Sequence, residues 1–309
     1  MRWTSPVGAT LLIGGVLGVG VYVVAVLDVV AGRLVARSSV LVGDALLQPA
    51  RRGALDLVTR RSSTRRPDAA AWALAPALVL SMAAVGTASV PYDRTVAAAD
   101  VTDGIVLFGA AMAIVMVGVF LHGWSANSPM PLLGGYRFIA AALSYEMPLA
   151  LVLIAAALPA RSLSVGAIVV SQAGLWNVVR QPLGLPLYLV AAAGLAFWGP
   201  LQQPDAADLA GGTASEVSGP ARLAWKVAQC SVLVAAACMG AAVFLGGWQG
   251  PVLPGWTWMA LKTIAVLGVI VAAGHRVARI RLERFVTVAW AVLIPLALVD
   301  VLASGALAL

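Results

Sequence analysis

Long apolar segments separated by short polar ones repeat along this whole sequence. Each apolar segment has close to the twenty residues that an α-helix needs to cross a bilayer. The pattern predicts an all-α, polytopic membrane protein with about eight transmembrane helices. Because the apolar runs recur over the whole length, we expect residues 1–309 to form a single transmembrane domain. The predicted spans are 7–31, 69–91, 102–124, 138–159, 183–201, 220–246, 256–275 and 286–305.

Residues 41–60 depart from this pattern. Apolar residues such as Leu46, Leu47 and Val58 recur there at helical spacing, and charged residues such as Arg51 fill the other positions. This arrangement predicts an amphipathic helix that lies in the membrane interface. The alternative is a solvated basic loop whose charges only enforce the orientation of the protein.

The composition agrees with a membrane location. Hydrophobic residues make up 61% of the chain and charged residues only 11%, whereas soluble domains have about 25% charged residues. A net charge of +7 would point to nucleic acid in a soluble protein. In a membrane protein, the enrichment of Arg and Lys in cytoplasmic loops explains it better. We therefore expect lipid, and no nucleic acid, around this chain.

The basic residues fall mainly on one side of the predicted spans. The loops and helix ends after spans one, three, five and seven hold 15 of the 20 Arg and Lys residues. This distribution predicts that those loops face the cytoplasm and that both termini lie on the outer side. The five remaining basic residues are Arg2, Arg94, Arg161, Arg180 and Lys262.

The sequence carries no motif for catalysis or metal binding. It lacks a Gly-rich phosphate loop, a Ser/His/Asp set and metal-ligand spacing. Its cysteines, Cys230 and Cys238, are eight residues apart on one predicted helix, about 12 Å, which is too far for a disulfide. We expect no catalytic residue, no metal site and no bound cofactor. His122 and His275 are expected to be interfacial side chains, and the alternative for each is a proton relay.

Glu146 is singled out as the only acid well inside a predicted span. An ionised carboxylate there costs several kcal/mol without a partner, and acids in spans often belong to proton relays. Pro148 follows two residues later and frees the carbonyl of Ser144 beside the acid. The alternative for Glu146 is a protonated acid that only hydrogen-bonds to a neighbouring helix.

Several segments resemble one family in the same order along the chain. They are "ALLQPARRGALDL" (45–57), "GWSANSPMPLLGGYR" (123–137), "LSYEMPLAL" (143–151), "RQPLGLPLYLVAA" (180–192) and "FLGGWQGPVLP" (244–254). Together they are similar to the H subunit of NADH-quinone oxidoreductase (complex I subunit 1), over roughly residues 20–300. Membrane subunits of energy-converting hydrogenases and formate hydrogenlyases are relatives of that family.

The resemblance implies a non-redox membrane subunit of a proton-translocating enzyme in the plasma (inner) membrane of a prokaryote. Such a subunit joins the redox arm to the pump arm and lines the cavity for quinone, the substrate of the complex. Iron–sulfur and flavin centres, or nickel–iron centres, then belong to partner subunits, both membrane and soluble. The alternatives are a hydrogenase-type subunit, a divergent paralogue, or a degenerate membrane anchor for a soluble redox enzyme.

The resemblance also implies roles for individual residues. In the family the loop at 202–219 is acidic and walls the quinone cavity, so Asp205, Asp208 and Glu216 join Glu146 as candidates for a proton path. Asp28, Arg33, Trp198 and Gln202 are candidates for lining the quinone cavity. Candidates for docking a soluble subunit are Arg276, Arg279, Arg281 and Arg284.

This chain departs from the family just upstream of that loop. Leu195, Trp198 and Gln202 stand where the family usually has Glu, Arg and Asp. The segment after the first span also lacks the family's usual Gly-Pro-Asn-Arg-Val-Gly-Pro. Both changes fall on the implied quinone cavity, which indicates weakened or altered quinone coupling.

Overall fold

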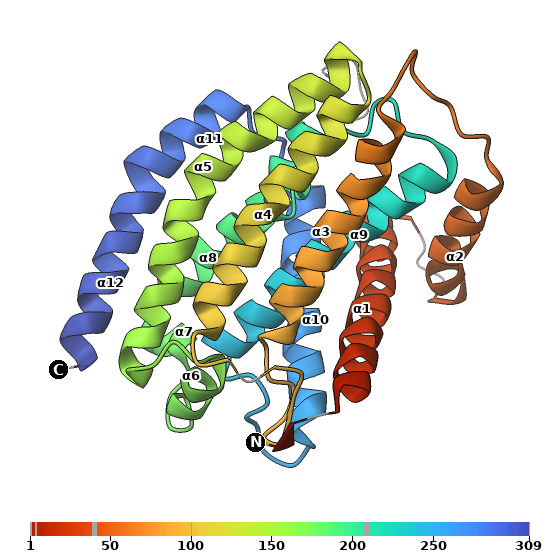
Figure 1. Cartoon of the computed structure of the whole chain (residues 1–309). Coiled ribbons are helices and arrows are strands. Elements are labelled where there is room, and N and C mark those ends of the chain that lie inside the picture. Colours follow the sequence, from red (N-terminus) through yellow and green to blue (C-terminus); the bar gives the residue numbers. More distant parts are fainter. Residues whose placement is uncertain (1, 4, 39–41, 100, 207–210, 309) are drawn as a thin grey trace.

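A computed structural model of the chain describes residues 2–3, 5–38, 42–99, 101–206 and 211–308 (Figure 1). Apart from one short parallel pair, β1 (Arg2–Trp3) and β2 (Val96–Ala97), the elements of these residues are helical. The α-helices are α1 (Pro6–Val35), α2 (Val42–Val58), α3 (Ala69–Ala88), α4 (Gly104–Ser125), α5 (Pro129–Ala157), α6 (Val165–Ser171), α7 (Asn177–Arg180), α8 (Gly184–Leu195), α9 (Gly219–Phe244), α10 (Gly255–Arg276), α11 (Leu282–Val288) and α12 (Ile294–Ala308).

Shorter turns complete the path. Three 3₁₀ turns are η1 (Leu158–Ala160), η2 (Gly199–Leu201) and η3 (Gln203–Asp205), and a π-helical segment, η4 (Ala289–Leu293), joins α11 to α12. Local signals in the sequence set the helix starts. The side chain of Ser5 accepts a hydrogen bond from the N–H of Gly8 at 3.2 Å. The side chain of Asp68 accepts one from the N–H of Ala71 at 3.1 Å. Both are N-cap side chains that satisfy an otherwise free donor of the first turn.

The predicted all-α polytopic fold is confirmed. Within the described residues, seven helices are long and apolar enough to cross a membrane. The prediction for 183–201 was wrong in length, because α8 has only 12 residues and ends at Leu195. That is about 18 Å of helix, short of the roughly 30 Å hydrocarbon layer. Phe197 and Gly199 both have positive φ, and these turns stop the helix. Helix α8 nevertheless lies within the bundle, beside the longer helices (Figure 1).

Helix α9 lies at the centre of the bundle and packs against α1, α2, α3, α8 and α10. Its middle turns consist almost entirely of Ala, Val, Cys and Gly and are buried. Small side chains let neighbouring backbones approach closely, which is how helices associate where lipid removes the hydrophobic driving force. The edge opposite α1 is formed by α11 and α12, which pack on α5 (Figure 1).

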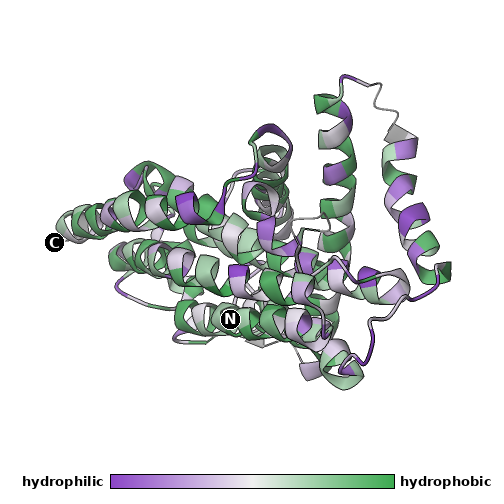
Figure 2. Cartoon of the chain, turned by 90° about the horizontal axis from the view of Figure 1, so that it is seen from above, coloured by the Kyte–Doolittle hydropathy of each residue, from purple (hydrophilic) through white to green (hydrophobic). Residues whose placement is uncertain are grey.

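Polar residues gather at the two ends of the bundle. Both termini lie at the end that carries α6 and α7, whereas α2 and the α10–α11 connection lie at the other end (Figure 1). The bundle helices are mainly hydrophobic, and hydrophilic residues concentrate in the loops and on α2 (Figure 2). The end with α2 carries the 15 basic residues counted above, and we call it the basic end.

The predicted amphipathic helix is present as α2. It packs against α1 and α9, and the hydroxyl of Tyr22 in α1 donates a hydrogen bond to the carbonyl of Leu46. Leu47, Leu55 and Leu57 each remain more than half exposed. An exposed apolar face on a charged helix is typical of a membrane interface, and this location of α2 stays a prediction.

The close contact between α4 and α5 yields a test of the packing. A Cβ at Gly123 would clash with the carbonyl oxygen of Pro131, while a Cβ at Gly109, on the same helix, meets nothing within 4 Å. We expect Gly123→Ala to destabilise the protein by about 1–3 kcal/mol, because two backbones would have to separate. Gly109→Ala should be neutral or slightly stabilising. Thermal unfolding in solubilised membranes measures both, and equal midpoints would contradict this packing.

Candidate functional site

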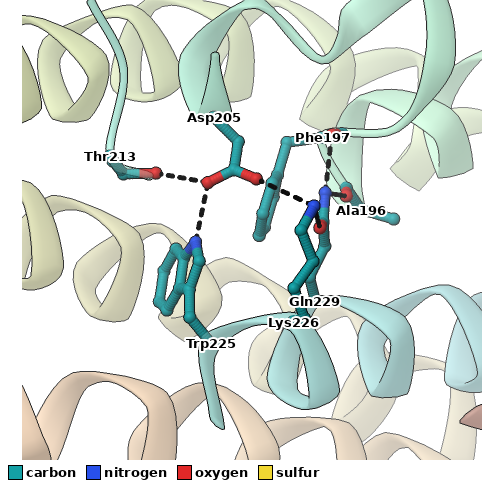
Figure 3. Close-up of polar contacts among 7 residues, drawn as sticks. All are labelled: Ala196, Phe197, Asp205, Thr213, Trp225, Lys226 and Gln229. Carbon is teal, nitrogen blue, oxygen red and sulfur yellow. Dashed lines mark hydrogen bonds and ion pairs between the residues drawn. The ribbon is translucent and has the colours of Figure 1, made fainter. Parts of the chain in front are cut away.

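A buried carboxylate, Asp205, organises the basic end of the bundle (Figure 3). Its Oδ1 accepts hydrogen bonds from Thr213 Oγ1 and from Trp225 Nε1, each at 2.7 Å. Its Oδ2 lies 3.6 Å from Nζ of Lys226. A buried carboxylate is tolerated only when it is paired and hydrogen-bonded. Asp205 therefore ties η3 and the segment at Thr213 to the first turns of α9.

Lys226 extends this network toward the end of α8. Its Nζ donates to Oε1 of Gln229 at 3.2 Å, and Nε2 of Gln229 donates to the carbonyl of Phe197 at 3.0 Å and to that of Ala196 at 3.4 Å. These carbonyls follow the last turn of α8, where the left-handed residue Phe197 leaves them without helical partners. The network thus fixes the turn that ends α8.

Aromatic rings pack around the Asp205 network. The ring of Trp225 stacks on that of His122, with centroids 3.8 Å apart, and on Phe197 at 5.8 Å. Trp72 donates from Nε1 to Nε2 of His122 at 3.2 Å. This bond requires an unprotonated Nε2, so the imidazole here is neutral. The side chain of His122 is buried between Trp72 and Trp225, and its place at the membrane interface stays a prediction.

A cavity of about 460 Å³ lies beside the network, between α1, α2 and α9. Asp28, Trp198 and Lys226 line it, together with charged residues of α2 and α9. Lys226 therefore belongs both to the cavity wall and to the Asp205 network. The remaining charged residues of the wall are Arg52, Asp56 and Arg222.

Two of the four residues predicted to line a quinone cavity lie in this wall. Besides lining it, Asp28 accepts a contact of 2.9 Å from the ring of His275, which lies in the last turn of α10. Arg33 instead donates to Oε1 of Gln48 at 3.2 Å. Gln202 belongs to the turn between η2 and η3 and does not line the cavity.

The acids predicted for a proton path are not all together. Asp205 is at the centre of the network, whereas Glu216 is half-buried and accepts a hydrogen bond from Ser128 at 3.2 Å. Asp208 lies outside the described residues. Glu146 on α5 is also only half-buried and makes no hydrogen bond or ion pair with the described residues. Its neighbour Ser144 donates to the carbonyl of Ala140 at 3.0 Å.

The four arginines predicted to dock a soluble subunit are exposed on and around the α10–α11 connection. This connection is fastened to the turns that carry the site. The N–H of Ile280 donates to the carbonyl of Pro200, and that of Leu282 donates to Oε1 of Gln203 at 3.0 Å. These hydrogen bonds thus connect the loop that holds Asp205 to the surface formed by Arg276, Arg279, Arg281 and Arg284.

Sequence reasoning missed several residues of the site. Thr213, Trp225 and Gln229 have no distinctive motif and become recognisable only through their contacts with Asp205 and Lys226. Among all the described residues, no group of three or more His, Cys, Asp and Glu residues that could hold a metal is found. The statement that Glu146 is the only acid well inside a span was wrong, since Asp300 is buried within the last one.

The fold and the site define a class: a multi-pass helical membrane protein with a buried acid network and a charged cavity at one end of its bundle. A family model described as NADH dehydrogenase matches residues 8–305. The chain therefore belongs to the NADH dehydrogenase family.

Individual relatives agree with this assignment, and each is an H subunit of NADH-quinone oxidoreductase. The one numbered 2 in Geobacter sulfurreducens is 32% identical over 242 residues, which are 75% of this chain and 74% of the relative. The one numbered 1 in Geobacter metallireducens has the same identity and coverage. The relative from Syntrophotalea carbinolica is 31% identical over 252 residues, 78% of this chain and 76% of the relative.

The network predicts a strong dependence of stability on Asp205. Asp205→Ala leaves two buried donors without an acceptor, at about 1–3 kcal/mol each. The ion pair adds little, because the Lys226 side chain is 37% exposed. We expect a loss of roughly 2–5 kcal/mol, with a smaller loss for Asp205→Asn, which keeps an acceptor.

Glu216→Ala is the matched control for this change, since it removes a half-buried acid with a single hydrogen bond from the same loop. Thermal unfolding and the rate of proteolysis within the loop measure the effect. If Asp205→Ala were as stable as Glu216→Ala, the Asp205 network would not hold this end together.

Proposed function

We propose that this chain is the membrane subunit of a complex I-like, proton-translocating oxidoreductase that lines the quinone cavity. One observation carries the proposal: the charged cavity between α1, α2 and α9 shares Lys226 with the buried Asp205 network. Reduction of a quinone to a quinol consumes two electrons and two protons. A cavity that takes up such a ring therefore needs hydrogen-bond donors and a route for protons. Lys226 lines the cavity and belongs to the Asp205 network, so it connects the cavity with that network.

The residues of the cavity have distinct proposed tasks. Cationic groups such as Arg222 and Lys226 stabilise negative charge that develops on the quinone oxygens. Asp28 lies 2.9 Å from the ring nitrogen of His275, and together they form an acid–base couple that passes a proton toward the cavity. Asp205 balances the charge of Lys226 from the protein side.

The chain acts without a redox centre of its own in this proposal. Electrons reach the quinone from iron–sulfur and flavin centres, or nickel–iron centres, held by partner subunits, and this chain binds no cofactor. The basic end faces the cytoplasm and both termini lie outside, as the positive-inside rule requires. The surface of Arg276, Arg279, Arg281 and Arg284 docks the soluble redox arm.

The family departures alter the cavity. Trp198 lines it where the family usually has Arg, which removes a cation and adds a flat apolar face. Leu195 is buried in the core at the end of α8 and does not line the cavity. We infer that quinone binding here depends more on ring stacking and less on charge than in members that keep these residues.

The first test concerns Asp28. In the assembled complex, Asp28→Asn removes the negative charge but keeps the shape of the side chain. We expect the kcat of quinone reduction to fall roughly tenfold, equivalent to about 1.4 kcal/mol in the barrier, because an amide cannot pass the proton. Asp103→Asn, an exposed acid at the opposite end, is the control and should leave the kcat unchanged. Equal kinetics for the two variants would argue that the cavity does not take the quinone.

The second test concerns Glu146. Glu146→Gln keeps the size and polarity of the side chain but cannot titrate, so assembly should be normal. We expect proton translocation per electron pair in vesicles to fall sharply while quinone reduction continues. Unchanged pumping would make Glu146 a structural acid and would favour the alternative of a membrane anchor without coupling.

A further inference from the structure

The last membrane-spanning segment contains a second acid that the proposed quinone site does not use. Asp300 lies on α12, and its side chain is only 2% exposed. Ser304 follows one helical turn later on the same face and is 1% exposed. Helix α12, which carries both residues, ends near the C-terminus, at the end of the bundle that carries α6 and α7 (Figure 1).

Asp300 faces the first turn of α8. Its Oδ2 is 3.3 Å from the position that a Cβ at Gly184 would occupy, and Phe244 closes the other side. The N–H of Gly184 donates to the carbonyl of Gln181 at 3.0 Å, so the acid lies close to the turn that precedes α8. The absence of a side chain at Gly184 makes room for the carboxyl group.

The polar atoms around this turn have unused hydrogen-bonding capacity. Among the described residues, Asp300 Oδ2 and Ser304 Oγ have no hydrogen-bond partner, and neither does Gln181 Oε1. The amide nitrogen of Gln181 is engaged, donating to the carbonyl of Ala155 at 2.7 Å. Gln181 Oε1 can only accept a hydrogen bond. A protonated carboxyl group needs no counter-charge in such surroundings, whereas an ionised one does.

No counter-charge is paired with Asp300 in the part of the chain that the structure describes. The ion pairs at Asp205 and at Asp28 do not include it. The elements packed on α12 are α5, α8, η1 and η4. An unpaired charge at such a depth costs several kcal/mol. The titratable side chains of these elements are Tyr136, Arg137, Tyr145 and Glu146 of α5 and Tyr188 of α8, and Arg161 directly follows η1.

The backbone before Asp300 is irregular. The π-helical segment η4 ends at Leu293, and Pro295, which has no N–H to donate, follows in the first turn of α12. Single π-helical turns inside α-helices are rare and occur frequently at functional sites. Asp300 and Ser304, both buried, follow this segment on α12.

We propose that Asp300 is a proton-exchange site in the outer half of the bundle, separate from the Asp205 network. The carboxyl group is protonated at rest. A change of side-chain rotamer brings the carboxyl group within hydrogen-bond distance of the Ser304 hydroxyl, to which it is not bonded at rest. Ser304 accepts this proton while it releases its own to water on the side of the termini, and the carboxylate regains a proton by the reverse path. A hydroxyl group can accept and donate at once, and Ser304 lies one turn closer to that surface.

Infrared difference spectroscopy of the assembled complex in membranes, transferred from H₂O to D₂O, tests this. The protonated Asp300 should give a carboxyl C=O band that shifts in D₂O. The band should disappear in Asp300→Asn, move in Asp300→Glu and persist in Glu146→Gln. An Asp300-dependent band that stays unshifted in D₂O would overturn the proposal, as would an ionised Asp300 at neutral pH.

Ser304→Ala supplies a second measurement that does not depend on removing the acid. It keeps the carboxyl group and should slow the shift in D₂O severalfold. An unchanged rate would remove Ser304 from the path and contradict the proposed route. If Asp300→Asn does not assemble, Asp300→Glu and Ser304→Ala still assign the band and decide the outcome. The infrared measurement does not involve quinone reduction. The proposal for Asp300 can therefore fail while the proposed function holds, and the reverse.

Discussion

The arrangement of the basic end depends on one buried carboxylate. Asp205 accepts hydrogen bonds from Thr213 and Trp225 and faces Lys226. Such a group is costly to bury, and the cost is offset only if all its partners keep their places. The loop after α8, the start of α9 and the aromatic stack at His122 are therefore positioned together. Polar interactions fix this end, whereas the middle turns of α9 pack closely through mainly small side chains.

The same constraint links structure to proposed function. Lys226 is held by Asp205 and Gln229 on one side and faces the charged cavity on the other. A cation held in this way is pre-organised, so in the proposed function it would stabilise developing negative charge without first having to reorient. The loop that contains Asp205 is also bonded to the α10–α11 connection. A soluble partner that docks on the arginines there would act on the site through these two hydrogen bonds.

Much of the fold was predictable from hydropathy, because each apolar run must satisfy its own backbone in lipid and a helix does this within one segment. The amphipathic pattern of α2 was equally readable. The failures have local causes. α8 ends early because Phe197 and Gly199 adopt positive φ, and Phe197 gives no signal of this. Asp300 was overlooked because it lies only a few residues from the end of its predicted span. The burial of His122 has no local signal either, because three rings from distant segments meet there.

The sequence by itself determined the class of protein, the approximate spans, the side on which basic residues gather and the family. These properties depend on composition and on local order along the chain. Only the tertiary structure decided which polar residues meet. Asp28 and Trp198 share a cavity with Lys226, while Arg33 and Gln202 do not, although all were equal candidates in the sequence. The reason is geometric. The rotation of each helix and the turns between helices decide which side chains come together, and a small difference in either takes a side chain out of the cavity wall.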